Sequence, residues 1–135
     1  MTTLTPVLTK NWDRADSFTR AGYERDGGYA AAPELLRRDT PPTCVFAVTD
    51  VMAIGALAAF RDSGLSVPGD ISLAGFDDVP IVRDLTPPLT TVALPLDAMG
   101  ERVMGLALRE PSARRSRIER VAGEVVLRAS TAAPR

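Results

Sequence analysis

The chain has 135 residues, 45% of them hydrophobic, which is enough for one domain with a buried core and excludes a wholly disordered chain. Its 16 Lys and Arg against 17 Asp and Glu give a formal net charge of −1, so bulk charge does not favour nucleic-acid binding. The absence of histidine and the single cysteine, Cys44, exclude His-based catalysis, His-ligated zinc and an internal disulfide.

The beginning of the chain gives no sign of targeting. Its first ten residues lack the charged start and apolar run of a secretory signal, and no stretch of the sequence approaches 18 apolar residues. We therefore expect no membrane segment and a cytoplasmic protein, a compartment that suits a free thiol. Residues 1–20 have weak periodicity and stay unassigned.

An alternation of helix and strand begins near residue 26. The spacing of apolar residues predicts a helix over about 26–36, with Asp26 as its N-cap and Pro33 as a kink or early stop. A short apolar run at 44–48 predicts a strand buried on both faces, in which Cys44 acts as an inert small hydrophobe.

A second helix and a second strand follow. The helix is predicted from Val51 to about Ser63, with Asp50 as N-cap and Gly64 as C-cap, and the strand at 71–74. Strands joined through a helix are expected to be parallel. This helix is apolar on nearly all sides, which leaves two alternatives: a neighbouring helix of the same chain covers its outer face, or a second subunit does.

The pattern changes after this unit. Residues 75–78 predict a turn at the carboxyl end of a parallel strand, the edge at which open α/β sheets bind ligands. Residues 80–85 suit a short helical turn, and two prolines make 86–92 extended. An amphipathic helix lying on a core is predicted over about 96–109, and a final strand at 121–127.

Three blocks of the sequence resemble the C-terminal part of the LacI/GalR family of bacterial transcriptional repressors. They are PTCVFAVTDVMAIGA at 42–56, GLSVPGDISLAGFDD at 64–78 and PLTTV at 88–92, and the segments 22–29 and 125–131 (VVLRAST) are also similar to the family. The resemblance implies an α/β, partial periplasmic-binding-protein-like (Rossmann-like) fold. Most of it would be the C-terminal subdomain, with parallel strands and flanking helices.

The resemblance also implies how the chain is divided. Residues 21–86 would form the C-terminal subdomain of an effector-binding domain, and 87–112 the crossover and last helix of the N-terminal subdomain. Residues 113–135 would be a connector, a return strand and a tail. The helix-turn-helix, the hinge and most of the first subdomain of such repressors are not in this sequence, so we expect a truncated LacI-type regulator.

By the same resemblance, Tyr23, Thr49 and Asp77 would contact a small-molecule effector such as a sugar. An aromatic ring stacks on sugar or purine faces, and a carboxylate accepts strong hydrogen bonds from hydroxyl groups. Tyr23 has a second interpretation as a packing residue, and Asp77 as a turn cap, although Asp78 fits the capping role better. We expect no cofactor, metal or catalysis, because nothing supplies a nucleophile, a third ligand or a phosphate loop.

Partners follow from the resemblance too. Ile54, Ile81, Val82 and Leu85 would lie in or near a homodimer interface. DNA would be bound only through a helix-turn-helix that this sequence lacks, and the chain alone should bind effector weakly or not at all. Two alternatives remain open: a sugar-binding protein of a transport system, and a non-functional remnant or dimerisation module.

Overall fold

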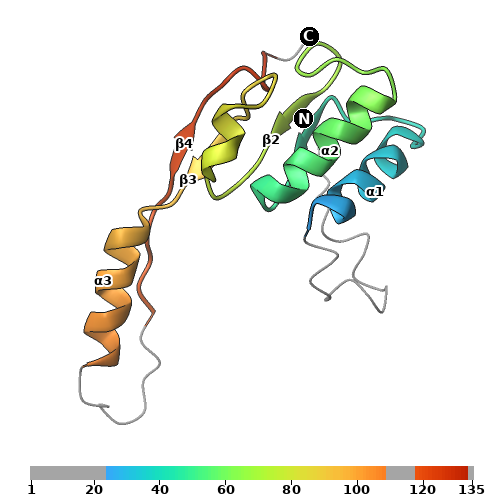
Figure 1. Cartoon of the computed structure of the whole chain (residues 1–135). Helices are drawn as coiled ribbons and strands as arrows, with labels where there is room; N and C mark the ends of the chain where they lie inside the picture. Colours follow the sequence, from blue (N-terminus) through green and yellow to red (C-terminus); the bar gives the residue numbers. More distant parts are fainter. Residues whose placement is uncertain (1–23, 109–117, 134–135) are drawn as a thin grey trace.

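The computed structural model of the chain describes residues 24–108 and 118–133 (Figure 1). Tyr23 therefore lies outside the described residues. In chain order the elements are α1 (Arg25–Leu36), β1 (Cys44–Phe46), α2 (Asp50–Asp62), β2 (Ser72–Ala74), the 3-10 helix η3 (Pro80–Arg83), β3 (Thr91–Ala93), α3 (Leu96–Ala107) and β4 (Glu124–Val126).

The predicted strand–helix–strand unit is confirmed. β1 and β2 are parallel neighbours with Val45 opposite Leu73, and α2 connects them. Isolated parallel bridges from Ala74 to Thr90 and from Asp77 to Ala93 extend this pairing toward β3. The core lies between the strands and the two helices, and its largest fully buried apolar side chains are Phe60, Ile71, Leu73, Leu89 and Val82.

A helix of the same chain packs along α2, as the first of the two alternatives expects, while Val51 of α2 stays 40% exposed. α1 lies along α2 at close range (Figure 1). A Cβ at Gly28 of α1 would overlap the carbonyl oxygen of Met52, and one at Gly55 of α2 would overlap that of Arg25. Two glycines thus let the helix backbones touch.

The ends of the helices correct two predicted caps. Thr49, not Asp50, is the N-cap of α2, because its hydroxyl accepts a hydrogen bond of 3.2 Å from the Met52 N–H. Asp26 lies inside α1, which begins at Arg25 and continues past Pro33 to Leu36.

The predicted end of α2 is confirmed. Gly64 has a φ of +77°, a left-handed conformation that glycine adopts without a steric penalty. Its N–H donates to the Arg61 carbonyl, and the Leu65 N–H donates to the Phe60 carbonyl. These two bonds form a Schellman motif, which satisfies carbonyls that the helix leaves without partners.

β1 is not buried on both faces as predicted. Val45 is buried, whereas Cys44 and Phe46 are exposed. Successive side chains of a strand point to opposite faces, and among the described residues only the face toward the helices is covered. Cys44 is consequently an exposed thiol and not a core residue.

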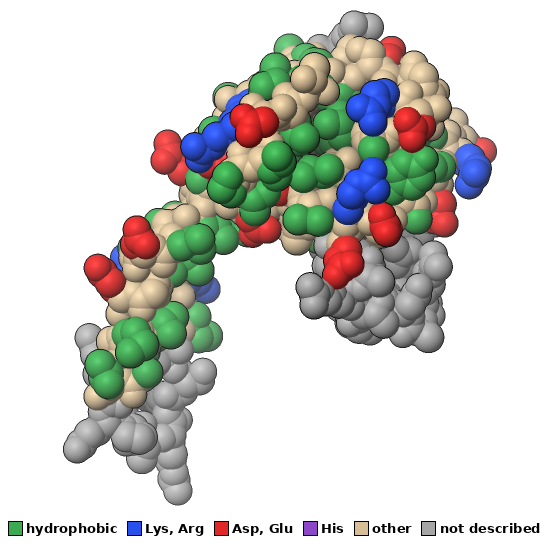
Figure 2. Space-filling model, viewed as in Figure 1, with side chains coloured by type: hydrophobic (Ala, Val, Ile, Leu, Met, Phe, Trp, Pro, Cys, Tyr) green, Lys and Arg blue, Asp and Glu red, His purple; other side chains and the backbone are tan. Residues whose placement is uncertain are grey.

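The segment from β3 through α3 to β4 forms an arm that projects from this body (Figure 1). β3 and β4 pair antiparallel, with Val92 opposite Val125, and α3 follows β3. α3 has the predicted bounds within two residues, but none of its residues is buried, which contradicts the expectation that it lies on a core. Figure 2 shows hydrophobic side chains along its surface, and Leu96, Val103, Met104 and Leu108 are exposed. In the described residues no helix is both long and apolar enough to cross a bilayer.

Candidate functional site

Two loops meet at the carboxyl end of the parallel strands. One follows β1 and enters α2, and the other follows β2. The Asp50 N–H donates a hydrogen bond of 2.8 Å to the Phe76 carbonyl. The Val79 N–H in turn donates to Asp50 Oδ2 at 2.9 Å. The structure therefore brings the segments of Thr49 and Asp77 together at the edge where such sheets bind ligands.

A buried carboxylate fixes this junction. Asp50 has no exposed surface, yet both of its carboxylate oxygens are paired. Thr91 Oγ1 donates to Asp50 Oδ1 at 2.6 Å, while Oδ2 accepts the Val79 N–H already described. A buried carboxylate needs such partners, because a buried acceptor without a hydrogen bond pays the full cost of its lost hydration. Asp50 thus joins the loop after β2 to β3.

Asp77 stands at the centre of the second loop in an unusual backbone conformation. Its φ is +115°, a region that residues other than glycine seldom adopt. The Asp77 N–H donates to the Val92 carbonyl at 3.0 Å, but within the described part of the chain its carboxylate accepts no hydrogen bond. Burial raises the pKa of the Asp77 carboxyl, and the nearby Asp50 carboxylate raises it further. Strained residues of this kind cluster at ligand sites.

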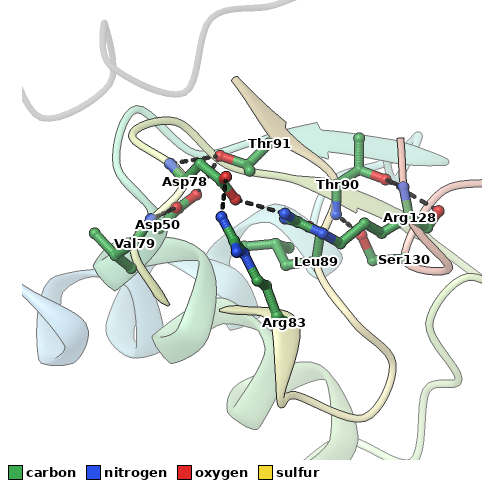
Figure 3. A network of polar contacts seen from close by, with 9 residues as sticks. All are labelled: Asp50, Asp78, Val79, Arg83, Leu89, Thr90, Thr91, Arg128 and Ser130. Atoms are coloured by element: carbon green, nitrogen blue, oxygen red, sulfur yellow. Dashed lines mark hydrogen bonds and ion pairs between the residues drawn. The ribbon is translucent and has the colours of Figure 1, made fainter. Parts of the chain in front are cut away.

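Asp78 has the opposite surroundings. Its φ is +52°, and its carboxylate accepts hydrogen bonds from two guanidinium groups (Figure 3). Arg128 Nη2 lies 2.6 Å from Oδ1, and Arg83 Nη2 lies 2.9 Å from Oδ2. Burial acts to raise the pKa of Asp78, but the hydrogen bonds from Arg128 and Arg83 outweigh it and hold that pKa below its ordinary value. Asp78 therefore anchors the loop through its side chain and is not a simple turn cap.

The return segment after β4 locks the crossover to the sheet. Ser130 Oγ donates to the Leu73 carbonyl at 2.6 Å and accepts the Thr90 N–H at 2.7 Å. Thr90 Oγ1 accepts the Arg128 N–H at 2.9 Å, and Arg128 Nη1 donates to the Leu89 carbonyl at 2.8 Å. Residues 89–91 and 128–130 thus form one polar joint beside Asp78 (Figure 3).

The predicted effector residues that the structure describes differ in their hydrogen bonds. Asp77 has a carboxylate without a hydrogen-bond partner in the described residues, whereas the hydroxyl oxygen of Thr49 accepts from the N–H of Met52. Thr49 therefore has a structural role that does not use its hydroxyl proton. The prediction for Tyr23 falls on a residue outside those that the structure describes.

The predicted interface residues are not all at the surface. Ile81 is 54% exposed, and Ile54 and Leu85 are half-buried against the core. Val82 has no exposed surface and packs into the core beside Leu89, so its side chain is not available to a partner, and its place near an interface stays a prediction.

Sequence reasoning missed the residues that hold the site in place. Asp50 was predicted as a helix cap, and Arg128 and Ser130 were noted only as part of a family-like tail. The 50 positions between Asp78 and Arg128 leave no local pattern that would pair them. The one available signal was the presence of an arginine and a serine in a block that resembles the family.

The comparisons decide the family. The sequence profile of the periplasmic binding protein-like domain matches residues 5–131. The chain belongs to this family. Its relatives are LacI-family transcriptional regulators, which confirms the resemblance drawn from the three sequence blocks.

Relatives of known name are similar over most of this chain but are much longer. The HTH-type transcriptional regulator MalR of Streptomyces coelicolor is 47% identical over 88 residues, which cover 65% of this chain and 25% of that protein. The HTH-type transcriptional repressor PurR of Shigella dysenteriae is 39% identical over 101 residues, or 75% of this chain and 28% of that protein. The chain thus spans about a quarter of the length of these regulators.

Solved structures agree with the family. A sugar-binding LacI-family regulator from Escherichia coli, complexed with phosphate, is 30% identical with a TM-score of 0.70, covering 82% of this chain and 40% of that one. A LacI-family regulator from Enterococcus faecalis with bound ribose is 32% identical with a TM-score of 0.69, covering 81% and 41%. The fold is therefore that of part of a periplasmic-binding-protein-like domain.

Proposed function

We propose that this chain is the effector-sensing and dimerising part of a cytoplasmic LacI-type transcriptional regulator, and that Asp77 contacts the effector. The observation that carries the proposal is a half-buried carboxylate without a hydrogen-bond partner among the described residues. It lies on a strained loop at the carboxyl edge of a parallel sheet.

The chemistry of Asp77 suits a ligand rich in hydroxyl groups. An ionised carboxylate accepts hydrogen bonds only, and charged acceptors form the stronger ones. Thr49 lies on the adjacent loop and keeps its hydroxyl proton for donation, since its oxygen already accepts from Met52. The relative described with bound ribose supports a sugar as the ligand class.

Binding by the isolated chain should be weak. This chain matches about two fifths of each solved relative, so a site made in this chain alone supplies only part of the contacts. We expect a dissociation constant in the millimolar range, which corresponds to about −4 kcal/mol.

An NMR titration tests the proposal. The ¹⁵N-labelled chain is titrated at millimolar concentrations with a pentose, a hexose, sucrose and a purine base. One of them should shift the amide signals of residues 75–79, and Asp77→Asn should abolish the shifts. Asparagine tolerates positive φ better than most residues, so this variant changes the charge and preserves the loop. Shifts that Asp77→Asn leaves intact, or no shifts with any ligand, would contradict the proposal.

The relatives favour a regulator over the two alternatives. Those compared above are named as transcriptional regulators and not as transport proteins or enzymes. A dimerisation module without a ligand would still dimerise but give no response in the titration.

A further inference from the structure

The loop that carries Asp77 is held from a distant part of the chain. Asp78 follows Asp77 directly, and its carboxylate is bound by Arg128, which lies 50 positions away in the return segment after β4. The same guanidinium donates from Nη1 to the Leu89 carbonyl of the crossover (Figure 3). One planar side chain thus fastens the loop to two crossing segments.

The contact between Arg128 and Asp78 is sheltered from water. The side chains of Arg128 and Asp78 are 14% and 10% exposed, whereas Arg83, the other partner of Asp78, is 63% exposed. Exposed ion pairs are screened by solvent and hold geometry poorly, and partly buried pairs are screened much less. Arg128 is therefore the partner that fixes the position of Asp78.

The loop requires an outside restraint. Asp77 and Asp78 both have positive φ, and neither is a glycine. Such conformations persist only when surrounding contacts enforce them. Hydrogen bonds hold both N–H groups of this pair: the Asp77 N–H donates to the Val92 carbonyl, and the Asp78 N–H donates to the side-chain hydroxyl of Thr91 at 3.4 Å. The Asp50 carboxylate holds the next residue, Val79, and the side chain of Asp78 itself is held by Arg128 and the exposed Arg83.

We propose that Arg128 is a positioning residue of the effector site: through Asp78 it holds the Asp77 loop in its strained conformation and keeps the Asp77 carboxylate aimed at the ligand. The role of Asp77 as ligand contact rests on the function proposed above. The positioning itself is a property of the chain without ligand and is tested without one.

The test measures the pKa of the Asp77 carboxyl by ¹³C NMR in the full chain and in Arg128→Gln. Burial raises this pKa in the wild type. If Arg128 positions the loop, its loss lets the carboxyl swing into water, and the pKa falls toward the ordinary value of about 3.9. If Arg128 acts only as a nearby positive charge, its removal leaves the pKa of Asp77 unchanged or raises it, and either result overturns the proposal.

Arg83→Gln is the matched control, because it removes the same charge from the same carboxylate. Because the Arg83 guanidinium is exposed, its removal should leave the pKa of Asp77 unchanged. An equal fall of that pKa in Arg83→Gln would overturn the specific role of Arg128. Should Arg128→Gln lose its dispersed spectrum, Arg128→Lys replaces it. A lysine keeps the charge but lacks the planar fork whose two nitrogens bind Asp78 and Leu89 separately, so a fall is still expected and an unchanged pKa again overturns the proposal.

The two proposals fail separately. A fall of the Asp77 pKa in Arg128→Gln together with no sugar response in the wild type would leave the positioning intact and reject the effector role. A sugar response that Asp77→Asn abolishes, together with an unchanged pKa in Arg128→Gln, would reject the positioning alone.

Discussion

Thr91 donates a hydrogen bond of 2.6 Å from its hydroxyl to Oδ1 of Asp50, a carboxylate with no exposed surface. The two residues are 41 positions apart. The bond connects the start of α2 to β3, and so it fixes the crossover against the body of the fold. A buried charge whose donor is removed cannot recover the bond from water.

Thr91→Val should therefore destabilise the chain. It leaves Asp50 Oδ1 without its hydroxyl donor, at a cost of about 1–3 kcal/mol or more, because the acceptor is a carboxylate. Urea unfolding followed by circular dichroism measures the change. Thr43→Val is the control, since its exposed hydroxyl makes no hydrogen bond in the described residues. Equal effects of the two substitutions would show that the Asp50 contact contributes nothing.

The contact between α1 and α2 gives a second prediction. Gly55→Ala adds a methyl group where the Arg25 carbonyl stands. The backbone at that point cannot move aside as the end of a flexible side chain could. We expect a loss of about 1–3 kcal/mol, the usual cost of overpacking, or more. Gly100→Ala in α3 meets open space and should instead favour the helix by up to about 1 kcal/mol. Thermal unfolding of both variants checks the contrast, which disappears if the helices separate in solution.

Local patterns predicted the strand–helix–strand unit well. The apolar run at β1, the apolar helix and Gly64 each carry their signal within a few residues. Adjacent candidates were harder to separate, and the cap was assigned to Asp50 although its neighbour Thr49 makes the bond. Both residue types cap helices well, so only the backbone position decides.

Distant pairings could not be predicted. Nothing local connects Asp78 with Arg128 or Asp50 with Thr91, because each pair forms only when the crossover returns to the sheet. The amphipathic pattern of α3 shows which face suits a core, but not whether the described chain supplies one. The burial of Val82 could not be predicted for a related reason, since a turn of four residues is too short for periodicity to distinguish inside from outside.

The two neighbouring acids should respond to pH with opposite sign. The pKa of Asp78 is lowered in the folded state, so its contribution to stability is present above about pH 3.9 and is lost as pH falls through the folded pKa. The pKa of Asp77 is raised, so its contribution is present below about pH 3.9 and is lost as pH rises through the folded pKa. Each unit between folded and unfolded pKa corresponds to about 1.4 kcal/mol.

Urea unfolding from pH 3 to 7 of the wild type, Asp78→Asn and Asp77→Asn separates the two. The stability advantage of the wild type over Asp78→Asn should shrink as the solution becomes more acidic. Its advantage over Asp77→Asn should shrink as pH rises above about 4. Parallel curves for all three proteins would show that neither carboxyl differs between folded and unfolded states.

The proposed homodimer gives the last prediction. Ile81 is 54% exposed on η3 and lies near the half-buried Leu85, whereas Val103 is 61% exposed on the projecting α3. A charge placed in an apolar interface must be desolvated without a partner, so Ile81→Asp should weaken dimerisation at least tenfold, or about 1.4 kcal/mol. Val103→Asp, matched in exposure and chemistry, should leave it unchanged. Light scattering over a concentration series measures both. A wild type that stays monomeric at every concentration would show that the chain alone forms no dimer. A dimer that Val103→Asp disrupts and Ile81→Asp spares would show that the interface lies elsewhere.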